Sequence, residues 1–92
     1  MERLSEAEIQ ERLKGSAWQR RDEAIERDLD RGDFGKAISF VNAVARLAED
    51  ANHHPDILVH DYRHVRLSLS THSAGGLTEG DFALAAAIDA LA

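Results

Sequence analysis

The spacing of hydrophobic and polar residues along the chain predicts three helices. The first covers residues 5–14, because Ser5 and Glu8 match a capping box and Leu4 and Ile9 are placed for a hydrophobic staple. These features satisfy backbone N–H groups at the helix start and fix the direction of the incoming chain. The other two helices are predicted from longer apolar stripes.

The strongest helical pattern begins after Asp33, which can act as the N-cap, and ends at Asn52. Its apolar residues recur every three or four positions, as on one face of a helix. The predicted stripe consists of Phe34, Ile38, Val41, Ala45 and Ala48, widened by Ala37, Val44 and Leu47. A third helix is expected to open at Thr78. Its inward residues are expected to be Leu84, Ile88 and Leu91.

Alternation of apolar and polar residues predicts a hairpin between the first two helices. Ile25 and Leu29 alternate with charged residues, and residues 21–23 can form a turn. We therefore expect two short antiparallel strands within residues 17–29. The apolar face of this segment is thin, which leaves a helix as the alternative.

A second hairpin is predicted after the long helix. Val65, Leu67 and Leu69 alternate with polar residues up to His72, which indicates a half-buried strand with one polar face. Residues 56–62 can pair with it as the preceding strand. The order helix, two strands, long helix, two strands, helix predicts an α+β fold: a four-stranded antiparallel sheet with three helices packed on one face.

Composition and charge narrow the class of protein. A chain of 92 residues makes one domain, residues 1–92, with a small core, and such domains often gain stability by forming homodimers or homotetramers. The net charge of −6 argues against nucleic acid as a partner. Cysteine is absent, the N-terminus is too charged for a signal peptide, and no apolar run reaches membrane length. We expect a soluble cytoplasmic protein without membrane contacts.

All five histidines lie within one quarter of the chain: His53, His54, His60, His64 and His72. For any single one, a structural role or a solvated position is the more common explanation. His60 and His64 fit solvent-facing strand positions. The other three lie at the ends of predicted elements, beside Pro55 or a glycine pair, where sites are more common.

A histidine cluster can serve metal binding, nucleophilic catalysis or acid–base catalysis. Adjacent His53 and His54 project in different directions, no histidine pair has metal-ligand spacing on a helix, and cysteine is absent, so no metal ion is expected. The serines near the histidines lack a nucleophile-elbow pattern. Imidazole, with an unperturbed pKa of ~6.5, can both accept and donate a proton at neutral pH. Acid–base catalysis without a cofactor is therefore the favoured hypothesis.

The segments "EDANHHP" and "STHSAGGLTEGDF", with Tyr62 between them, resemble the signature of the pterin-4a-carbinolamine dehydratases. Trp18, the pair Asp33-Phe34 and residues 37–40 extend the resemblance over nearly the whole chain. The resemblance implies a hydro-lyase that removes water from a 4a-hydroxytetrahydropterin during tetrahydropterin recycling, giving the quinonoid dihydropterin without a cofactor. It also implies assembly as dimers or tetramers.

The resemblance implies catalytic roles for His53, His54 and His72. Substrate-binding roles are expected for Glu49, Pro55, Ser70, Thr71 and Asp81. Asp81 has a second interpretation of equal weight, because Thr78-x-x-Asp81 also matches a helix capping box.

One departure from the family pattern and one alternative function remain open. Six residues separate Pro55 from Tyr62 where the family usually has five, so a strand bulge or a shifted site wall could result. The alternative function is a non-catalytic module on the same scaffold, which binds pterin or acts as a dimerisation or assembly cofactor of another protein.

Overall fold

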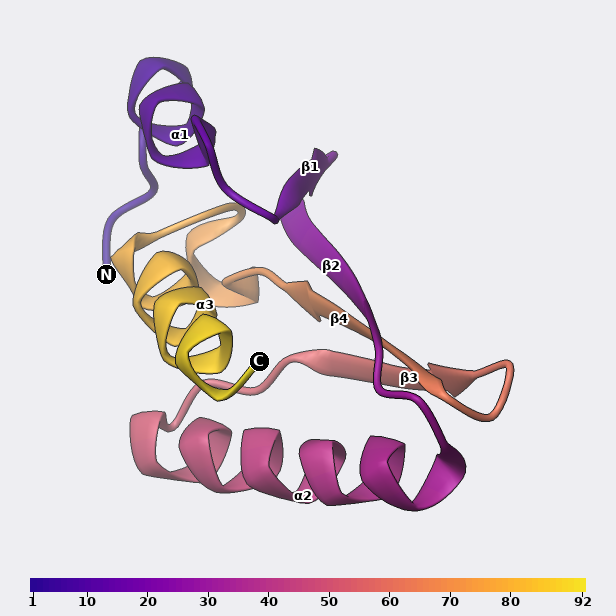
Figure 1. Cartoon of the computed structure of the whole chain (residues 1–92). Helices are drawn as coiled ribbons and strands as arrows, with labels where there is room; N and C mark the ends of the chain where they lie inside the picture. Colours follow the sequence, from indigo (N-terminus) through magenta and orange to yellow (C-terminus); the bar gives the residue numbers. More distant parts are fainter.

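The computed structural model describes residues 1–92 and contains one four-stranded antiparallel sheet and three α-helices (Figure 1). The elements are α1 (Glu6–Leu13), β1 (Gln19–Arg21), β2 (Ala24–Asp30), α2 (Phe34–Ala51), β3 (Asp56–His60), β4 (His64–Leu69), a one-turn 3-10 helix η1 (His72–Ala74) and α3 (Glu79–Leu91). This order confirms the predicted fold class. The helical alternative for the first hairpin was wrong.

The sheet has the strand order β1-β2-β4-β3, so the two hairpins lie side by side with β2 and β4 at the centre. The pairing of β3 with β4 is continuous from Asp56 opposite Ser68 to His60 opposite His64. Of the two possible results of the extra residue, the strand bulge is therefore absent from this strand pair. Tyr62 lies in the connection between the two strands with a positive φ of 52°, and its side chain is exposed.

One face of the sheet is buried and the other is open to solvent. The buried face carries Ile25, Leu29, Val65, Leu67 and Leu69, which form a single core with residues of the helices. Apart from Ala24 at the start of β2, the side chains that alternate with these residues on β2 and β4 are polar or charged and lie on the open face.

Helix α2 packs on the sheet by a different edge of its apolar stripe than predicted. Its buried residues are Ala37, Phe40, Val44 and Ala48, whereas Phe34, Ile38 and Ala45 are exposed. The helix is apolar over much of its circumference. The spacing of its apolar residues therefore predicted the helix correctly but did not show which side of it faces the core. Asp33 caps its start as predicted, and Asn52 ends it in the left-handed conformation.

Helix α3 is fixed to the sheet at both ends. Thr78 is its N-cap and forms a capping box with Asp81, while Leu84 and Ile88 are buried as predicted. Leu91 was predicted to face inward but is 40% exposed, because it lies on the last turn beyond the core. None of the helices is long and apolar enough to cross a membrane.

The chain leaves the sheet earlier than the sequence pattern indicated. The predicted strand extended to His72, but β4 ends at Leu69. Thr71 then forms an isolated bridge with Gly76, and the residues between them close into η1. His72 consequently lies on a tight turn at the end of the sheet instead of on a strand.

Candidate functional site

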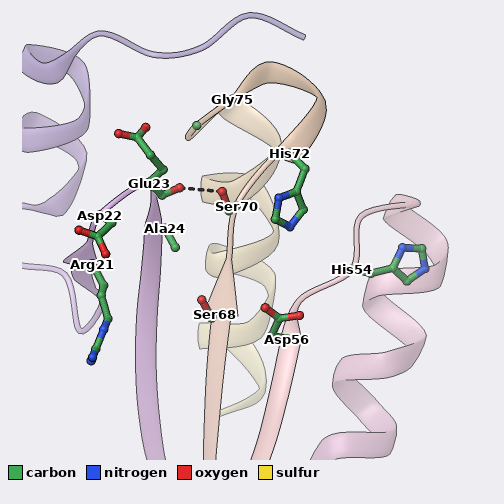
Figure 2. Close-up of a pocket in the computed structure, with 11 residues that line it drawn as sticks. Arg21, Asp22, Glu23, Ala24, His54, Asp56, Ser68, Ser70, His72 and Gly75 are labelled. Carbon is green, nitrogen blue, oxygen red and sulfur yellow. Dashed lines mark hydrogen bonds between the residues drawn. The ribbon is translucent and has the colours of Figure 1, made fainter.

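A cavity of about 410 Å³ lies at the end of the open sheet face where β2 begins and β4 ends (Figure 2). Ala24 is the only hydrophobic residue in its lining. The lining residues are Arg21, Asp22, Glu23, Ala24, His54, Asp56, Ser68, Ser70, His72, Gly75 and Gly76. Its volume is in the range of small-molecule sites, although its walls are more polar than is usual for them.

His72 reaches this cavity from η1, and its ring lies between Ser70 and the loop that carries His54 (Figure 2). The hydroxyl of Ser70 donates a hydrogen bond to the backbone oxygen of Glu23 at 2.6 Å. This bond ties the end of β4 to the turn between β1 and β2. The side of the cavity next to His72 is therefore fixed by the hydrogen bond between Ser70 and Glu23, which joins the two hairpins.

His54 borders the cavity on the opposite side, on the loop between α2 and β3, and its ring is turned toward the end of α2, away from His72 (Figure 2). Asn52 ends α2 with a positive φ of 49°, and the backbone N–H of His53 donates back to the oxygen of Ala48 at 3.0 Å. This closure turns the chain sharply away from the helix. The Nε2 of His54 then lies 2.7 Å from a carboxylate oxygen of Glu49, on the last turn of α2. Both side chains are exposed.

His53 points in another direction, into a hydrogen-bond network centred on Asp81. The side chain of Asp81 has no solvent exposure. Its Oδ1 lies 2.6 Å from Nε2 of His53, and its Oδ2 accepts from the Thr71 hydroxyl at 2.8 Å and the Thr78 backbone N–H at 2.9 Å. Thr71 and Thr78 also share a hydrogen bond between their hydroxyls at 2.9 Å.

These contacts show which ring nitrogen of His53 and of His54 donates a hydrogen bond. An ionised carboxylate can only accept hydrogen bonds, so Nε2 of His53 donates to Asp81 and Nε2 of His54 donates to Glu49. In the neutral form of each ring, Nδ1 is then the nitrogen that can accept a proton. Carboxylate-bound imidazoles of this kind are fixed in tautomer and orientation, which is what an acid–base group requires.

The structure brings some of the expected site residues together and separates others. His54, His72 and Ser70 line one cavity, and Glu49 contacts His54. His53 lies on a different, largely apolar cavity of about 480 Å³ between α2 and α3. Thr71, Asp81 and Pro55 do not line the polar cavity. His60 and His64 lie on the strands of the second hairpin, outside either cavity.

Four charged residues of the polar cavity were not expected from the sequence: Arg21, Asp22, Glu23 and Asp56. Arg21 and Glu23 belong to the first hairpin, whose place beside β4 cannot be read from local patterns. Asp56 could have been found from the alternation alone. It follows the histidine pair directly, and pairing of β3 with β4 places it opposite Ser68.

The chain is similar to known proteins over nearly its whole length. The family model described as pterin 4 alpha carbinolamine dehydratase matches residues 2–91. A Chloroflexus aurantiacus protein, provisionally named a pterin-4-alpha-carbinolamine dehydratase, is 57% identical over 90 residues, covering 97% of this chain and 96% of its own. An Acidobacterium capsulatum protein with the same provisional name is 52% identical over 92 residues, covering 99% of each chain.

Two solved structures are also similar. One is a transcriptional coactivator/pterin dehydratase from Brucella melitensis, with a TM-score of 0.90, 39% identity and 98% coverage of both chains. The other is a pterin dehydratase-like protein identified as a RuBisCO assembly factor in the alpha-carboxysome. It has a TM-score of 0.64 and 27% identity, covering 80% of this chain and 84% of its own.

Proposed function

This chain is a member of the pterin 4-alpha-carbinolamine dehydratase family, and from that premise we propose that it dehydrates a 4a-hydroxytetrahydropterin to the quinonoid dihydropterin. The observation that carries the proposal is the placement of His54 and His72 on one polar cavity, reached from different elements. The reaction needs one proton donor and one proton acceptor, and no cofactor.

The proposed chemistry is a balanced elimination of water. The C4a–O bond breaks as the hydroxyl group takes a proton and leaves as water, and N5 loses its proton as the C4a=N5 double bond forms. One histidine of the cavity, as imidazolium, donates to the leaving hydroxyl, and the other, as neutral imidazole, accepts from N5. Each catalytic cycle therefore leaves the total number of protons on the pair unchanged.

His53 and Asp81 take a positioning role in this proposal. His53 is adjacent in sequence to His54, and Thr71 is adjacent to His72. Asp81 holds both His53 and Thr71 through the same buried carboxylate. The network thus connects the two loops that carry the proposed proton donor and acceptor. Glu49 orients His54 directly through the 2.7 Å contact.

The substrate-binding roles are proposed for the polar groups that remain accessible in the cavity. Ser70 lines it, and Pro55 stiffens the loop between His54 and Asp56. Asp56 and Glu23 add carboxylates that can accept hydrogen bonds from the N–H groups of a pterin ring. The proposal therefore adds Asp56 and Glu23 to the set expected from the sequence.

The test is a turnover assay with freshly generated 4a-hydroxytetrahydropterin, in which formation of the quinonoid product is followed by absorbance. Acceleration above the uncatalysed rate, lost in His72→Ala and kept in Ser73→Ala, supports the proposal. Ser73 is a matched control because it lies on the same exposed turn but outside the cavity lining. Pterin binding without acceleration would overturn the enzymatic proposal.

A second candidate function is a protein-interaction module that assembles or dimerises another protein. The observation in its favour is the similarity to the pterin dehydratase-like RuBisCO assembly factor. The turnover assay separates the two candidates, since an assembly module needs no acceleration of dehydration. We also propose that the chain forms homo-oligomers, because apolar side chains remain exposed on α2 and β3.

A further inference from the structure

A second cluster of titratable side chains lies on the open sheet face, at the end opposite the cavity. It consists of Asp28 on β2, His60 on β3 and His64 on β4. Asp28 Oδ2 contacts Nε2 of His60, and Asp28 Oδ1 lies 2.9 Å from Nδ1 of His64. One donor atom from each residue lies within 4.8 Å of both others. The proposed dehydration uses none of the three.

The sheet itself fixes the relative positions of these residues. His60 and His64 are directly opposite in the β3–β4 pairing, and their rings stack at 5.1 Å with an interplanar angle of 28°. Asp28 lies on β2, which pairs with the other side of β4. It is opposite Arg66, two residues along β4 from His64. Groups on adjacent strands are held more rigidly than groups on loops.

We propose that Asp28, His60 and His64 bind a divalent transition-metal ion, for which Zn²⁺ is the best fit. Two imidazoles and one carboxylate suit zinc, which takes His nitrogen and Asp oxygen at about 2.0–2.2 Å. Donor atoms around a tetrahedral ion are then about 3.3 Å apart. The Asp28–His64 contact is already near this separation, so small side-chain rotations close the site. Water completes the coordination.

A second contact on His60 supports the proposal independently of the cluster itself. Its other ring nitrogen, Nδ1, lies 2.8 Å from a carboxylate oxygen of Asp61. A carboxylate on the non-coordinating nitrogen fixes the tautomer of a ligating histidine and raises its basicity, and it accompanies most histidine metal ligands. The arrangement leaves Nε2 of His60 directed at the position where the ion would lie.

The charges around the cluster limit how the ion is held. Arg66 Nε lies 3.2 Å from Asp28 Oδ2, so that oxygen keeps a cationic partner. The ion is therefore bound through Asp28 Oδ1, in a monodentate manner. Arg63 is engaged elsewhere, with two contacts to Asp30 at 2.7 and 2.8 Å. Binding releases the protons that the two coordinating nitrogens now share with Asp28.

The consequence of binding is structural. The ion would join β2, β3 and β4 at the hairpin end, about 13 Å along β2 from Ala24 at the cavity. Because only the folded sheet brings the donors together, the ion stabilises the folded state by mass action. The site could not be recognised from the sequence, because its three donors come from three strands. His60 and His64 come close together only through the pairing of β3 with β4.

The test is a titration of the untagged full-length chain with Zn²⁺ after chelator treatment, followed by calorimetry and by thermal unfolding. We expect saturable binding of one ion per chain. At about a hundredfold excess over the dissociation constant, the melting temperature should rise by on the order of 10 °C. Co²⁺ in place of Zn²⁺ should give the visible absorption bands of a low-symmetry site.

Variants identify the ligands. Asp28→Asn, His60→Gln and His64→Gln should each weaken binding by at least about 10–100-fold, whereas His72→Ala, which removes an imidazole from the cavity, should bind normally. Circular dichroism shows which of the three ligand variants fold. One folded ligand variant is sufficient to test the proposal. Absence of saturable binding, unchanged affinity in a folded ligand variant, or loss of binding in His72→Ala would overturn the proposal.

Discussion

At the scale of the residue, the buried carboxylate of Asp81 accepts hydrogen bonds from three separate segments: the loop after α2, the chain after β4 and the start of α3. The capping and site interpretations of Asp81 are compatible, because its two oxygens face different partners. Oδ2 serves the capping box and Thr71, while Oδ1 contacts His53. A change of Asp81 should therefore affect both the stability of the fold and the position of the loops that carry His54 and His72.

Asp81→Asn should lower both stability and turnover. The amide has only one acceptor oxygen, so at least one buried donor loses its partner, which costs about 1–3 kcal/mol of unfolding free energy. Turnover should fall mainly in kcat, since Asp81 does not line the cavity. Chemical denaturation and steady-state kinetics measure the two effects. A rise in KM with unchanged kcat would contradict the positioning role.

A milder change tests the same network without removing the carboxylate. Thr71→Val deletes only the hydroxyl that donates to Asp81 and retains a similar shape, so kcat should fall with a smaller loss of stability. Thr71→Ser keeps the hydroxyl and serves as the matched control. Equal kcat in the two variants would show that the link between Asp81 and the loop of His72 is unimportant.

His54 and His72 should behave as a unit in double-variant kinetics. Either single change to Ala is expected to lower the rate, after correction for uncatalysed dehydration, by roughly 10²–10⁴-fold, the usual range for a general acid or base. The double variant should lose much less than the product of the two single effects, because each group depends on the other. Multiplicative effects would indicate independent roles.

The candidate site was only partly predictable at this scale. The histidine cluster and its motifs identified His54 and His72, because these residues lie at the ends of elements. The separation of His53 was not predictable, since the direction of its ring depends on where α3 places Asp81. Glu23 was missed because its proximity to Ser70 and His72 depends on how the first hairpin packs beside β4.

At the scale of the element, α1 begins with a capping box in its first turn. Ser5 and Glu8 satisfy each other's backbone N–H groups, at 2.9 and 3.2 Å. Hydrogen bonds from the backbone and then the hydroxyl of Ser5 lower the pKa of Glu8 from its ordinary value of 4.5. A lowered folded-state pKa contributes stability above the ordinary value, and that contribution disappears as the pH falls through the folded-state pKa.

The capping box should therefore make α1 sensitive to acid. Amide exchange in α1 of the wild-type chain is expected to accelerate, relative to α3, as the pH falls below about 4.5. Glu8→Gln keeps an acceptor oxygen but cannot titrate, so its α1 should lose much of this pH dependence. Exchange rates corrected for intrinsic pH effects provide the measurement. Identical pH dependence in both chains would exclude Glu8 as the titrating group.

Elements were predicted well where local chemistry determines them. The capping residues Ser5, Asp33 and Thr78 and the terminator Asn52 all have the predicted roles. The buried face of α2 was predicted poorly, because apolar residues cover a wide part of the helix surface that includes both Phe34 and Phe40. Only the position of the sheet determines that Phe40 is buried and Phe34 is exposed.

At the scale of the whole molecule, several apolar side chains remain exposed on two surfaces. Phe34 and Ile38 lie on the outward side of α2, and Ile57 and Leu58 lie on β3, at an unpaired edge of the sheet. Phe34 and Leu58 are 54% and 50% exposed. Exposed apolar groups beside a free strand edge are typical of surfaces covered by a second copy.

Light scattering of the wild-type chain should therefore give a mass of at least two copies of 10.2 kDa. Ile38→Glu should shift the distribution towards smaller species, because a charge cannot be buried without a partner. Ser39→Glu is the control, since its side chain faces away from both the core and this apolar surface. A wild-type monomer at high concentration would contradict the expectation.

The two proposed sites should respond differently to a strong chelator. The dehydration rate should be unchanged after dialysis, because the proton donor and acceptor are imidazoles that need no ion. The melting temperature of zinc-loaded protein should fall under the same treatment, because the proposed ion joins three strands. A rate lost on dialysis and restored by Zn²⁺ would overturn the acid–base assignment.

The placement of β2 beside β4 has a consequence for the order of events during folding. The two outer strand pairs are local hairpins, which form within about 1–10 μs in isolation. The central pair joins Asp28 to residues some 36 positions further along, as its contact with His64 shows, so its formation must close a loop that contains all of α2. The transition state for folding should therefore include the β2–β4 contact, and Leu67→Ala at its centre should slow folding more than it speeds unfolding.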